Sequence, residues 1–364
     1  MYSSYELTAL MQDAAARGAS DIHLTAHCPP MMRVGGVLIP MGEEILDVEG
    51  CRALILSGLS EIQRARIEET WELDFLLDVA EIGRFRGNAH FARGALEAAY
   101  RLIPATVPDL ASLGHRPTAA EFCAMEEGLV LITGSTGSGK STTLAAMVQQ
   151  ISRERSGIIV TIEDPIEFLF PSALSLVKQR EVGTDTKTFS AALKHSLRQD
   201  PDVIVVSELR DQETIQAALT AAETGHLVIA TLHTIDAPKT IDRIVDVFPP
   251  DQQNQIITQL ANCLKGVISQ RLLPRKDGQG RVLAVETMFV NPGVASCIRD
   301  RKIQQLVGMI EIGKREGMNT LDESVLDLYD AGLISRDEAL LNARDPHSVP
   351  EEEDEAPKKR GLFG

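Results

Sequence analysis

The first part of the chain mixes helical and strand-like patterns of apolar residues. Residues 5–17 carry apolar side chains at helical spacing, which predicts an amphipathic helix. Residues 21–24 and 32–38 predict short strands, and residues 83–103 predict a β-hairpin with its turn at Arg93-Gly94. Helix and strand therefore alternate irregularly over about the first hundred residues, as in a small α+β domain.

Beyond residue 118 the pattern changes to short, continuous apolar runs separated by helical stretches. The runs occupy residues 128–133, 158–162, 203–206 and 227–232, and a helix is predicted at residues 140–152. Strands that are apolar on both faces suit a parallel sheet covered on both sides. This part of the sequence therefore predicts an α/β domain.

Breaks in these patterns predict the domain boundaries. The prolines at 104 and 108 interrupt both periods. We expect an N-terminal domain at residues 1–105, a linker at 106–117, the α/β domain at 118–346 and a disordered tail at 347–364. The tail is predicted from five consecutive acidic residues followed by a basic cluster, a composition typical of solvated chain.

Composition narrows the class of protein. The 364-residue chain has no apolar run near the ~18 residues that a membrane helix needs, and its start lacks the basic and apolar regions of a secretory signal. We therefore expect it in the cytosol. Its five cysteines are scattered, which favours reduced structural thiols over zinc. A net charge of −16 opposes nucleic-acid binding, and a DNA translocase would need basic loops facing a pore.

A glycine-rich motif carries the strongest chemical signal. Residues 134–141 match the phosphate-binding pattern G-x-x-x-x-G-K-[ST] between a predicted strand and a predicted helix. Such a loop turns backbone N–H groups toward phosphates at the positive end of the helix. Lys140 would neutralise β- and γ-phosphate charge and Ser141 would bind Mg²⁺. The expected contacts to ATP are Gly134, Ser135, Thr136, Gly137, Ser138, Gly139, Lys140, Ser141 and Thr142.

Carboxylates follow two of the predicted strands. Glu208 comes just after the run 203–206, where it can orient and deprotonate a water at the ligand-binding edge of a parallel sheet. Glu163, Asp164 and Glu167 follow the run 158–162. Three such charges repel one another unless a cation or water screens them. Magnesium held through water, for which Glu167 is the candidate ligand, and a solvated acidic turn both remain open.

Two histidines bracket the run 227–232. An extended strand would place His226 and His233 ~23 Å apart, so they cannot share a metal ion. His233, at the predicted carboxyl end, can sense the γ-phosphate or relay to a neighbouring subunit. A structural role for each histidine also remains open.

The predicted hairpin sets two arginines against each other. With a two-residue turn at 93–94, Arg86 and Arg101 lie directly opposite on neighbouring strands. Opposed guanidinium groups destabilise a hairpin. The clash is relieved if both groups point at an anion, such as a neighbouring subunit's γ-phosphate. Two independently solvated arginines are the alternative.

Four segments together resemble the signature boxes of the secretion ATPase superfamily: TGSTGSGKSTTLAAM, TIEDPIEF, LRQDPDVIVVSELRD and TAAETGHLVIATLHT. Within it, GASDIHL, KTIDRIVDVFP, ISQRLLP and GMNTLDESVLDLYDAGLIS resemble the type IV pilus retraction ATPases and their accessory paralogues. The resemblance runs over residues 5–345.

The resemblance implies a fold and an activity. It implies a RecA-like P-loop NTPase domain with a smaller α+β PAS-like N-terminal domain. It also implies a homohexamer at the cytoplasmic face of the inner membrane, at the pilus base. There, Mg-dependent ATP hydrolysis would drive pilin disassembly and twitching motility through a membrane platform protein, with a paralogous pilus ATPase as a further partner. Glu208 would be the catalytic acid.

The remaining site residues also match family motifs. Glu163 and Glu167 match the acidic box, and His226 and His233 match the histidine box. Arg86 and Arg101 match the arginines that the family donates across subunits.

Two departures from the family pattern leave alternatives open. Ser207 stands where the family usually has glycine before the catalytic Glu, and residues 294–302 match the late retraction motif only in part. An accessory retraction ATPase, another type II or type IV secretion ATPase and a nucleotide-gated scaffold with little hydrolysis are the alternatives. The chain lacks the four-cysteine zinc site usual in extension ATPases.

Overall fold

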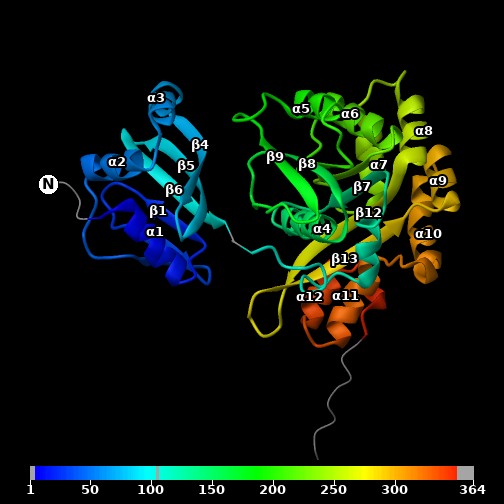
Figure 1. Ribbon diagram of the computed structural model, residues 1–364. Helices are drawn as coiled ribbons and strands as arrows, with labels where there is room; N and C mark the ends of the chain where they lie inside the picture. The colour runs from blue at the N-terminus through cyan, green and yellow to red at the C-terminus, as the bar shows by residue number, and fades with distance from the viewer. Residues whose placement is uncertain (1–4, 104–105, 351–364) are drawn as a thin grey trace, which may run out of the picture. The chain divides into compact units, whose positions relative to one another are not determined.

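The computed structural model of the chain describes residues 5–103 and 106–350 (Figure 1). The chain forms two compact units. The first takes in the chain up to Val107 together with the loop Pro165–Leu169, and the second takes in the rest from Pro108. Each unit has its own sheet and its own hydrophobic core.

The first unit is built on a six-stranded antiparallel sheet in the order β3-β2-β1-β6-β5-β4. Alternate side chains of its strands, such as Phe85 and Tyr100, are buried against helix residues that include Leu10 and Leu54. The opposite face of the sheet carries polar side chains. The elements are α1 (Leu7–Ala16), β1 (Asp21–Leu24), β2 (Met31–Val34), β3 (Val37–Pro40), α2 (Val48–Ser57), α3 (Glu61–Thr70), β4 (Glu72–Val79), β5 (Gly83–Ala92) and β6 (Ala95–Ile103).

Most local predictions for this unit are confirmed, and one is wrong. The helix, the strand at residues 21–24 and the hairpin are present. Arg93 and Gly94 have φ of 52° and 82°, as a tight hairpin turn requires. The single strand expected at residues 32–38 is instead two strands, because Gly35 and Gly36 have φ of 57° and 85° and turn the chain back on itself.

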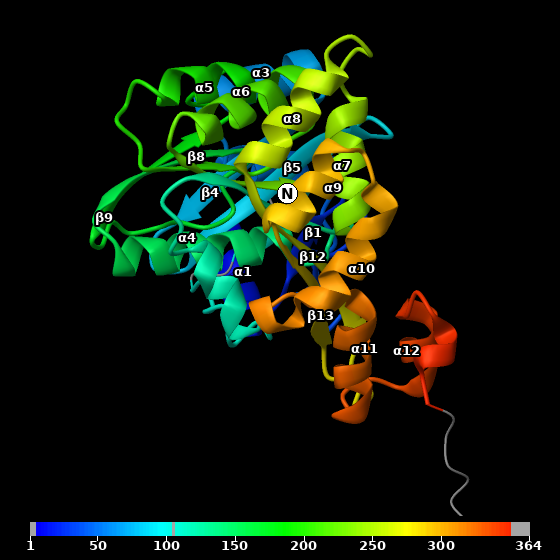
Figure 2. The ribbon, with the colours of Figure 1, turned by 90° about the vertical axis from the view of Figure 1, so that its right-hand side faces the viewer.

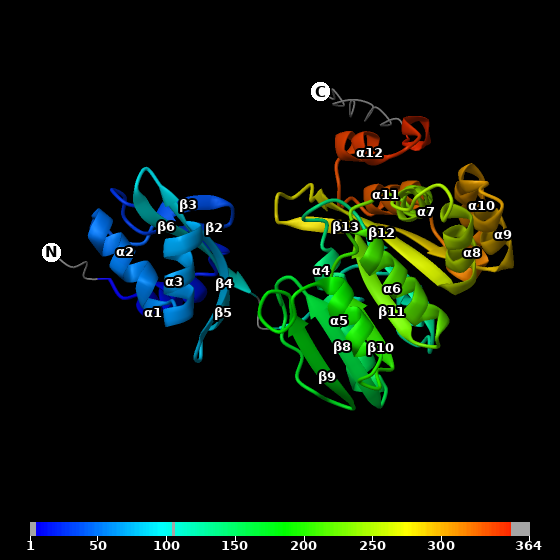
Figure 3. The same cartoon turned by 90° about the horizontal axis from the view of Figure 1, so that it is seen from above.

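The second unit is built on a seven-stranded sheet in the order β13-β12-β7-β11-β10-β8-β9 (Figure 3). Its strands are parallel except for β13, which runs antiparallel to β12 at the edge. The four predicted apolar strands form the centre of the sheet. The strands are β7 (Gly128–Thr133), β8 (Gly157–Glu163), β9 (Ser175–Glu181), β10 (Val203–Val206), β11 (Leu227–Leu232), β12 (Leu264–Pro274) and β13 (Arg281–Phe289).

Helices cover both faces of this sheet, which explains why its central strands are apolar throughout. Leu129 and Leu131 face the helices α5 and α6, whereas α4 lies on the opposite face (Figure 1). Helices α8, α9 and α10 lie side by side (Figure 2). The helices are α4 (Lys140–Glu154), α5 (Phe189–Ser196), α6 (Gln212–Glu223), α7 (Ala237–Asp246), α8 (Gln253–Cys263), α9 (Pro292–Arg299), α10 (Leu306–Ile312), α11 (Leu321–Asp330) and α12 (Arg336–Asn342), with short 3-10 helices η1 (Pro117–Phe122), η2 (Ile303–Gln305), η3 (Gly313–Glu316) and η4 (Pro346–Ser348).

The two ends of the second unit are more ordered than the composition suggests. Leu110 and His115, within the predicted linker at 106–117, are buried. Val349 is also buried, in a small core beneath α11 and α12, so the tail predicted at 347–364 begins too early. From residue 351 onward the predicted tail lies outside the described residues.

Candidate active site

The glycine-rich loop joins β7 to α4 at the carboxyl edge of the sheet. Gly134, Gly137 and Gly139 have φ of 146°, 77° and 88°, in the region that favours glycine. A Cβ on Gly134 would lie 2.4 Å from the carbonyl oxygen of Gln270 and 2.5 Å from Oγ of Ser138. The loop is therefore shaped by close packing as well as by backbone freedom.

Helix α4 begins at this loop with its positive end uncapped. Gly139 is the N-cap residue, so no side chain caps the helix, and its first turn has no acidic residue. The unpaired N–H groups and the helix dipole favour an anion at this end. Ser141 and Thr142 lie in the first turn, and Ser141 is exposed there. The buried Oγ of Ser138 has no partner in the described residues. These features fit a phosphate group.

Lys140 lies across the loop and is buried. Its Nζ donates to the carbonyl oxygens of Gly134 and Ser135, both at 2.8 Å. The same Nζ lies 3.4 Å from Nδ1 of His233. The ammonium group is thus held at the loop by carbonyl oxygens that a phosphate oxygen can replace.

Glu208 lies at the carboxyl edge of the sheet, two residues after β10. Its Oε1 is 2.9 Å from Nε2 of His233, and its Oε2 is 2.7 Å from Nη2 of Arg210. Partial burial opposes ionisation of Glu208, but the hydrogen bond from Arg210 and the charges of His233, Arg210 and Lys140 outweigh it. The pKa of Glu208 is therefore below its usual value, and the carboxylate is ionised at neutral pH.

The acidic segment after β8 does not gather its carboxylates around a cation. Glu163 is buried, and its Oε1 accepts hydrogen bonds from Oγ1 of Thr161 at 2.6 Å and from Nε2 of Gln179 at 3.0 Å. Asp164 is exposed and Glu167 is half-buried. In the part of the chain that the structure describes, no group of acidic, histidine or cysteine side chains can hold a metal ion alone. A magnesium ion here would need phosphate oxygens as well.

The two histidines lie at opposite ends of β11. His233 joins Glu208 and Lys140, whereas His226 lies at the amino end of the strand. Nδ1 of His226 is 3.0 Å from the carbonyl oxygen of Ala221 and lies beside the end of α6. Within one chain, His226 is therefore not part of the site around the glycine loop.

The two arginines lie opposite each other on the polar face of the first unit's sheet, in the predicted register. The same row continues across neighbouring strands through Asp21 to Arg33. Nε of Arg101 donates to Oδ1 of Asp21 at 2.8 Å, which relieves part of the repulsion. Arg86 is half-buried, and it has no hydrogen-bond or ion-pair partner among the described residues.

Sequence reasoning missed two side chains that support the loop. Gln270, on β12, is buried and donates through Nε2 to the carbonyl oxygen of Ser138 at 2.8 Å. His115 is buried with Nε2 2.9 Å from Oγ1 of Thr143, in the first turns of α4. Burial lowers the pKa of His115 to about 4, so the ring is neutral at pH 7. Each contact joins residues far apart in sequence, so no local pattern reveals it.

Comparisons with known proteins identify the family of the chain. The family model described as "Type II/IV secretion system protein" matches residues 4–316. The type IV pilus retraction ATPase PilT of Pseudomonas aeruginosa is 45% identical over 95% of this chain and 99% of its own length. The type IV pilus ATPase PilU of the same organism is 37% identical over 93% and 88%.

A solved structure is similar over nearly its whole length. The crystal structure of the pilus retraction motor PilT with bound ADP has a TM-score of 0.89 and 44% identity, covering 94% of this chain and 98% of that one. This likeness confirms the expected α/β class, with a RecA-like ATPase domain and a smaller N-terminal domain. Among the described residues, no helix combines the length and apolar character needed to cross a membrane.

Proposed function

The chain belongs to the type II/IV secretion system protein family and, within it, to the type IV pilus retraction ATPases, and from this premise we propose that it binds Mg-ATP at the loop 134–141 and hydrolyses it to drive pilus retraction. The observation that carries the proposal is the cluster of Glu208, His233 and Lys140 beside the uncapped start of α4. It joins an ionised carboxylate to a phosphate-binding loop.

The residues of the cluster divide the work of hydrolysis. Backbone N–H groups of residues 134–142 hold the phosphates, and Lys140 moves from the loop carbonyls to a phosphate oxygen. Glu208 orients the attacking water and takes its proton. His233 bridges Glu208 and Lys140, so it responds to the γ-phosphate.

Magnesium would lie beside the bound phosphates, where Ser141 would hold it directly and the ion would neutralise phosphate charge. Glu167 belongs to the loop Pro165–Leu169 of the first unit, and it stays the candidate that would hold the ion through water. Glu163 fixes the end of β8 through Thr161 and Gln179 rather than by holding the ion.

Arg86 and Arg101 complete the site from a neighbouring subunit of a homohexamer. An arginine delivered to the γ-phosphate stabilises charge that develops in the transition state. The pairing of Arg86 with Arg101 on the polar face of the first unit's sheet supports this role, because Arg86 has no hydrogen-bond or ion-pair partner among the described residues to give up. His226, at the far end of β11, contacts the carbonyl oxygen of Ala221 and takes no direct part in this site.

The motor works in the cytoplasm at the inner-membrane base of the pilus. A membrane platform protein receives its movement, and a paralogous pilus ATPase is a further partner. The higher identity to PilT than to PilU, 45% against 37%, favours a principal motor over an accessory one. The scaffold alternative rests on Ser207, but the contact of Glu208 with His233, which also lies beside Lys140 of the phosphate loop, favours hydrolysis.

Two measurements test this function. Purified wild-type protein should release phosphate from ATP in a magnesium-dependent reaction that Glu208→Gln slows by at least about a hundredfold. Deleting the gene in its own host should leave excess surface pili that do not retract. If the wild type hydrolyses ATP no faster than Glu208→Gln, the chain is the nucleotide-gated scaffold and not the motor. If deletion leaves the number of surface pili unchanged, the motor serves another secretion system.

A further inference from the structure

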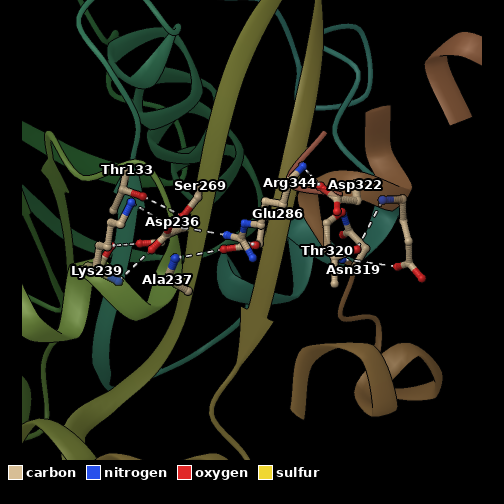
Figure 4. A network of polar contacts seen from close by, with 12 residues as sticks. Thr133, Asp236, Ala237, Lys239, Ser269, Glu286, Asn319, Thr320, Asp322 and Arg344 are labelled. Carbon is tan, nitrogen blue, oxygen red and sulfur yellow. Dashed lines mark hydrogen bonds and ion pairs between the residues drawn. The ribbon is translucent and has the colours of Figure 1, made fainter. Parts of the chain in front are cut away.

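The last helices of the chain return an arginine to the sheet that carries the candidate active site. Arg344 follows α12, and its Nη2 lies 2.8 Å from Oε2 of Glu286 on β13 and 3.6 Å from Oδ2 of Asp236 (Figure 4). Glu286 and Asp236 are both buried, and the two carboxylates come from elements far apart in sequence. One guanidinium group therefore joins the C-terminal segment, the edge strand and the start of α7.

Both carboxylates hold the first turn of α7. Asp236 is the N-cap residue, and its Oδ1 accepts from the backbone N–H of Lys239 at 2.7 Å. Oε1 of Glu286 accepts from the N–H of Ala237, the first residue of the helix, at 2.9 Å. The positive end of a helix favours such acceptors. Arg344 lies between the carboxylates and offsets the repulsion between two negative charges.

The start of α7 is only three residues from His233. β11 ends at Leu232, and His233, Thr234 and Ile235 lead directly to Asp236. Oγ1 of Thr234 is 2.6 Å from Oγ1 of Thr240, which ties the loop to α7 again. Because only Thr234 and Ile235 separate His233 from Asp236, a shift at Asp236 also moves the imidazole that contacts Glu208 and Lys140.

Arg344 is itself held by the C-terminal helices. Its backbone N–H donates to Oδ1 of Asp322 at 2.7 Å, and the N–H of Asp345 donates to Oδ2 of the same carboxylate at 3.2 Å. Asp322 lies in the first turn of α11, which starts beside β13, where the Asn319 side chain donates to the carbonyl of Val285. The position of Arg344 thus depends on how α11 and α12 sit on β13.

We propose that Arg344 is a positioning residue for ATP hydrolysis, which fixes the start of α7 through Asp236 and Glu286 and thereby sets His233 against Glu208. The proposal rests on the proposed function, because it assigns Arg344 a part in that reaction. It makes the C-terminal helices a component of the hydrolysis site, so that whatever displaces them slows turnover without touching the phosphate loop.

The test compares full-length Arg344→Met with wild type, with Arg344→Lys and with a matched control, Arg275→Met. Arg275 pairs with Asp277 at the exposed turn between β12 and β13, so the control removes the same charge from the same unit. We expect Arg344→Met to lower kcat by about tenfold to a hundredfold, since a small misplacement of a catalytic group has that effect. The Kd for ATP should stay within about twofold, because the loop is unchanged, and Arg344→Lys should recover part of kcat.

Amide hydrogen exchange supplies a readout that does not depend on activity. The segment 233–240 should exchange faster in Arg344→Met at a temperature well below its unfolding transition, whereas residues 128–133 should not change. A kcat equal to that of Arg275→Met would overturn the proposal. So would unchanged exchange at 233–240, or a loss of ATP binding in parallel with kcat. If the wild type does not hydrolyse ATP, the proposed function is wrong. The exchange experiment would still show whether Arg344 fixes residues 233–236.

Discussion

Glu208 and His233 end neighbouring parallel strands and meet at the edge of the sheet, with Oε1 of the carboxylate 2.9 Å from Nε2 of the imidazole. Because Nδ1 of the same ring lies 3.4 Å from Nζ of Lys140, the histidine joins the carboxylate to the phosphate loop. For the proposed reaction, this arrangement would supply a carboxylate base and a contact that changes when Lys140 moves to a phosphate.

Replacing Glu208 with Gln should remove the base and keep the shape of the site. We expect kcat to fall by about 10²–10⁴-fold, the range for loss of a general base. The Kd for ATP should change by less than about threefold, because the phosphate contacts come from the loop and α4. Phosphate release and fluorescent-nucleotide titration measure the two quantities. Glu213→Gln, an exposed carboxylate on α6, is the control; equal kcat for both variants would remove Glu208 from catalysis.

Gly134→Ala should damage the phosphate loop more than an ordinary glycine substitution does. Its Cβ would lie 2.4 Å from the carbonyl oxygen of Gln270, in a backbone conformation with φ of 146°. Gly278 also has positive φ, 72°, but a Cβ there meets nothing within 4 Å, so Gly278→Ala isolates the backbone cost. We expect ATP affinity to fall by at least about tenfold in Gly134→Ala and to stay near wild type in Gly278→Ala. Equal affinities would show that the loop relaxes around the methyl group.

His115 should make the second unit less stable in acid. Burial lowers the pKa of His115 from its ordinary 6.5 to about 4. Between these values the unfolded chain binds more protons, so the free energy of unfolding falls as pH decreases through this window, and the full contribution is present above it. From pH 7.5 to pH 5 the loss amounts to about 2 kcal/mol.

Urea unfolding at the two pH values checks this prediction. His115→Gln should lose less stability between pH 7.5 and pH 5 than wild type does, by about that 2 kcal/mol. His195→Gln, which replaces an exposed ring, is the control for the substitution itself. If His115→Gln and wild type lose equal stability, burial of the ring is not what links folding to protons.

The core strands were predictable because they are apolar throughout. Residues 203–206 and 227–232 were assigned to their full length, since nearly every residue of a strand buried on both faces is apolar. The hairpin register followed from one turn, and Arg86 does oppose Arg101. The prediction of one strand at 32–38 was wrong because Gly35 and Gly36, within the apolar run, were not interpreted as a turn.

The parts of the site that escaped prediction come from distant segments. Gln270 lies 132 residues along the chain from Ser138. Arg344 lies 58 residues (344 − 286) from Glu286. Such pairs leave no periodic signal, because the fold alone brings them together. Strands β12 and β13 were missed for a related reason, since they lie at one end of the sheet and carry Gln270 and Glu286 among their apolar residues.

Arg86 provides the sharpest test of a site shared between subunits. Arg86→Ala should lower kcat by at least about tenfold, because an arginine at the γ-phosphate acts on the transition state. ATP binding at Lys140 should persist. Lys140→Ala, in contrast, should lose nucleotide binding, since it removes the cation of the loop. Each variant alone is therefore expected to be nearly inactive for a different reason.

Mixed rings separate the two defects. In a ring assembled from equal amounts of both variants, about a quarter of the interfaces join an intact Lys140 to an intact Arg86 from the neighbouring subunit. Activity should rise toward that fraction of wild type as the subunits exchange. Arg66→Ala, an exposed arginine on α3, should be as active as wild type alone and behave like it in the same mixture. If Arg86→Ala and Lys140→Ala form mixed rings that stay inactive at every ratio, Arg86 does not act across the interface, and the site belongs to one chain.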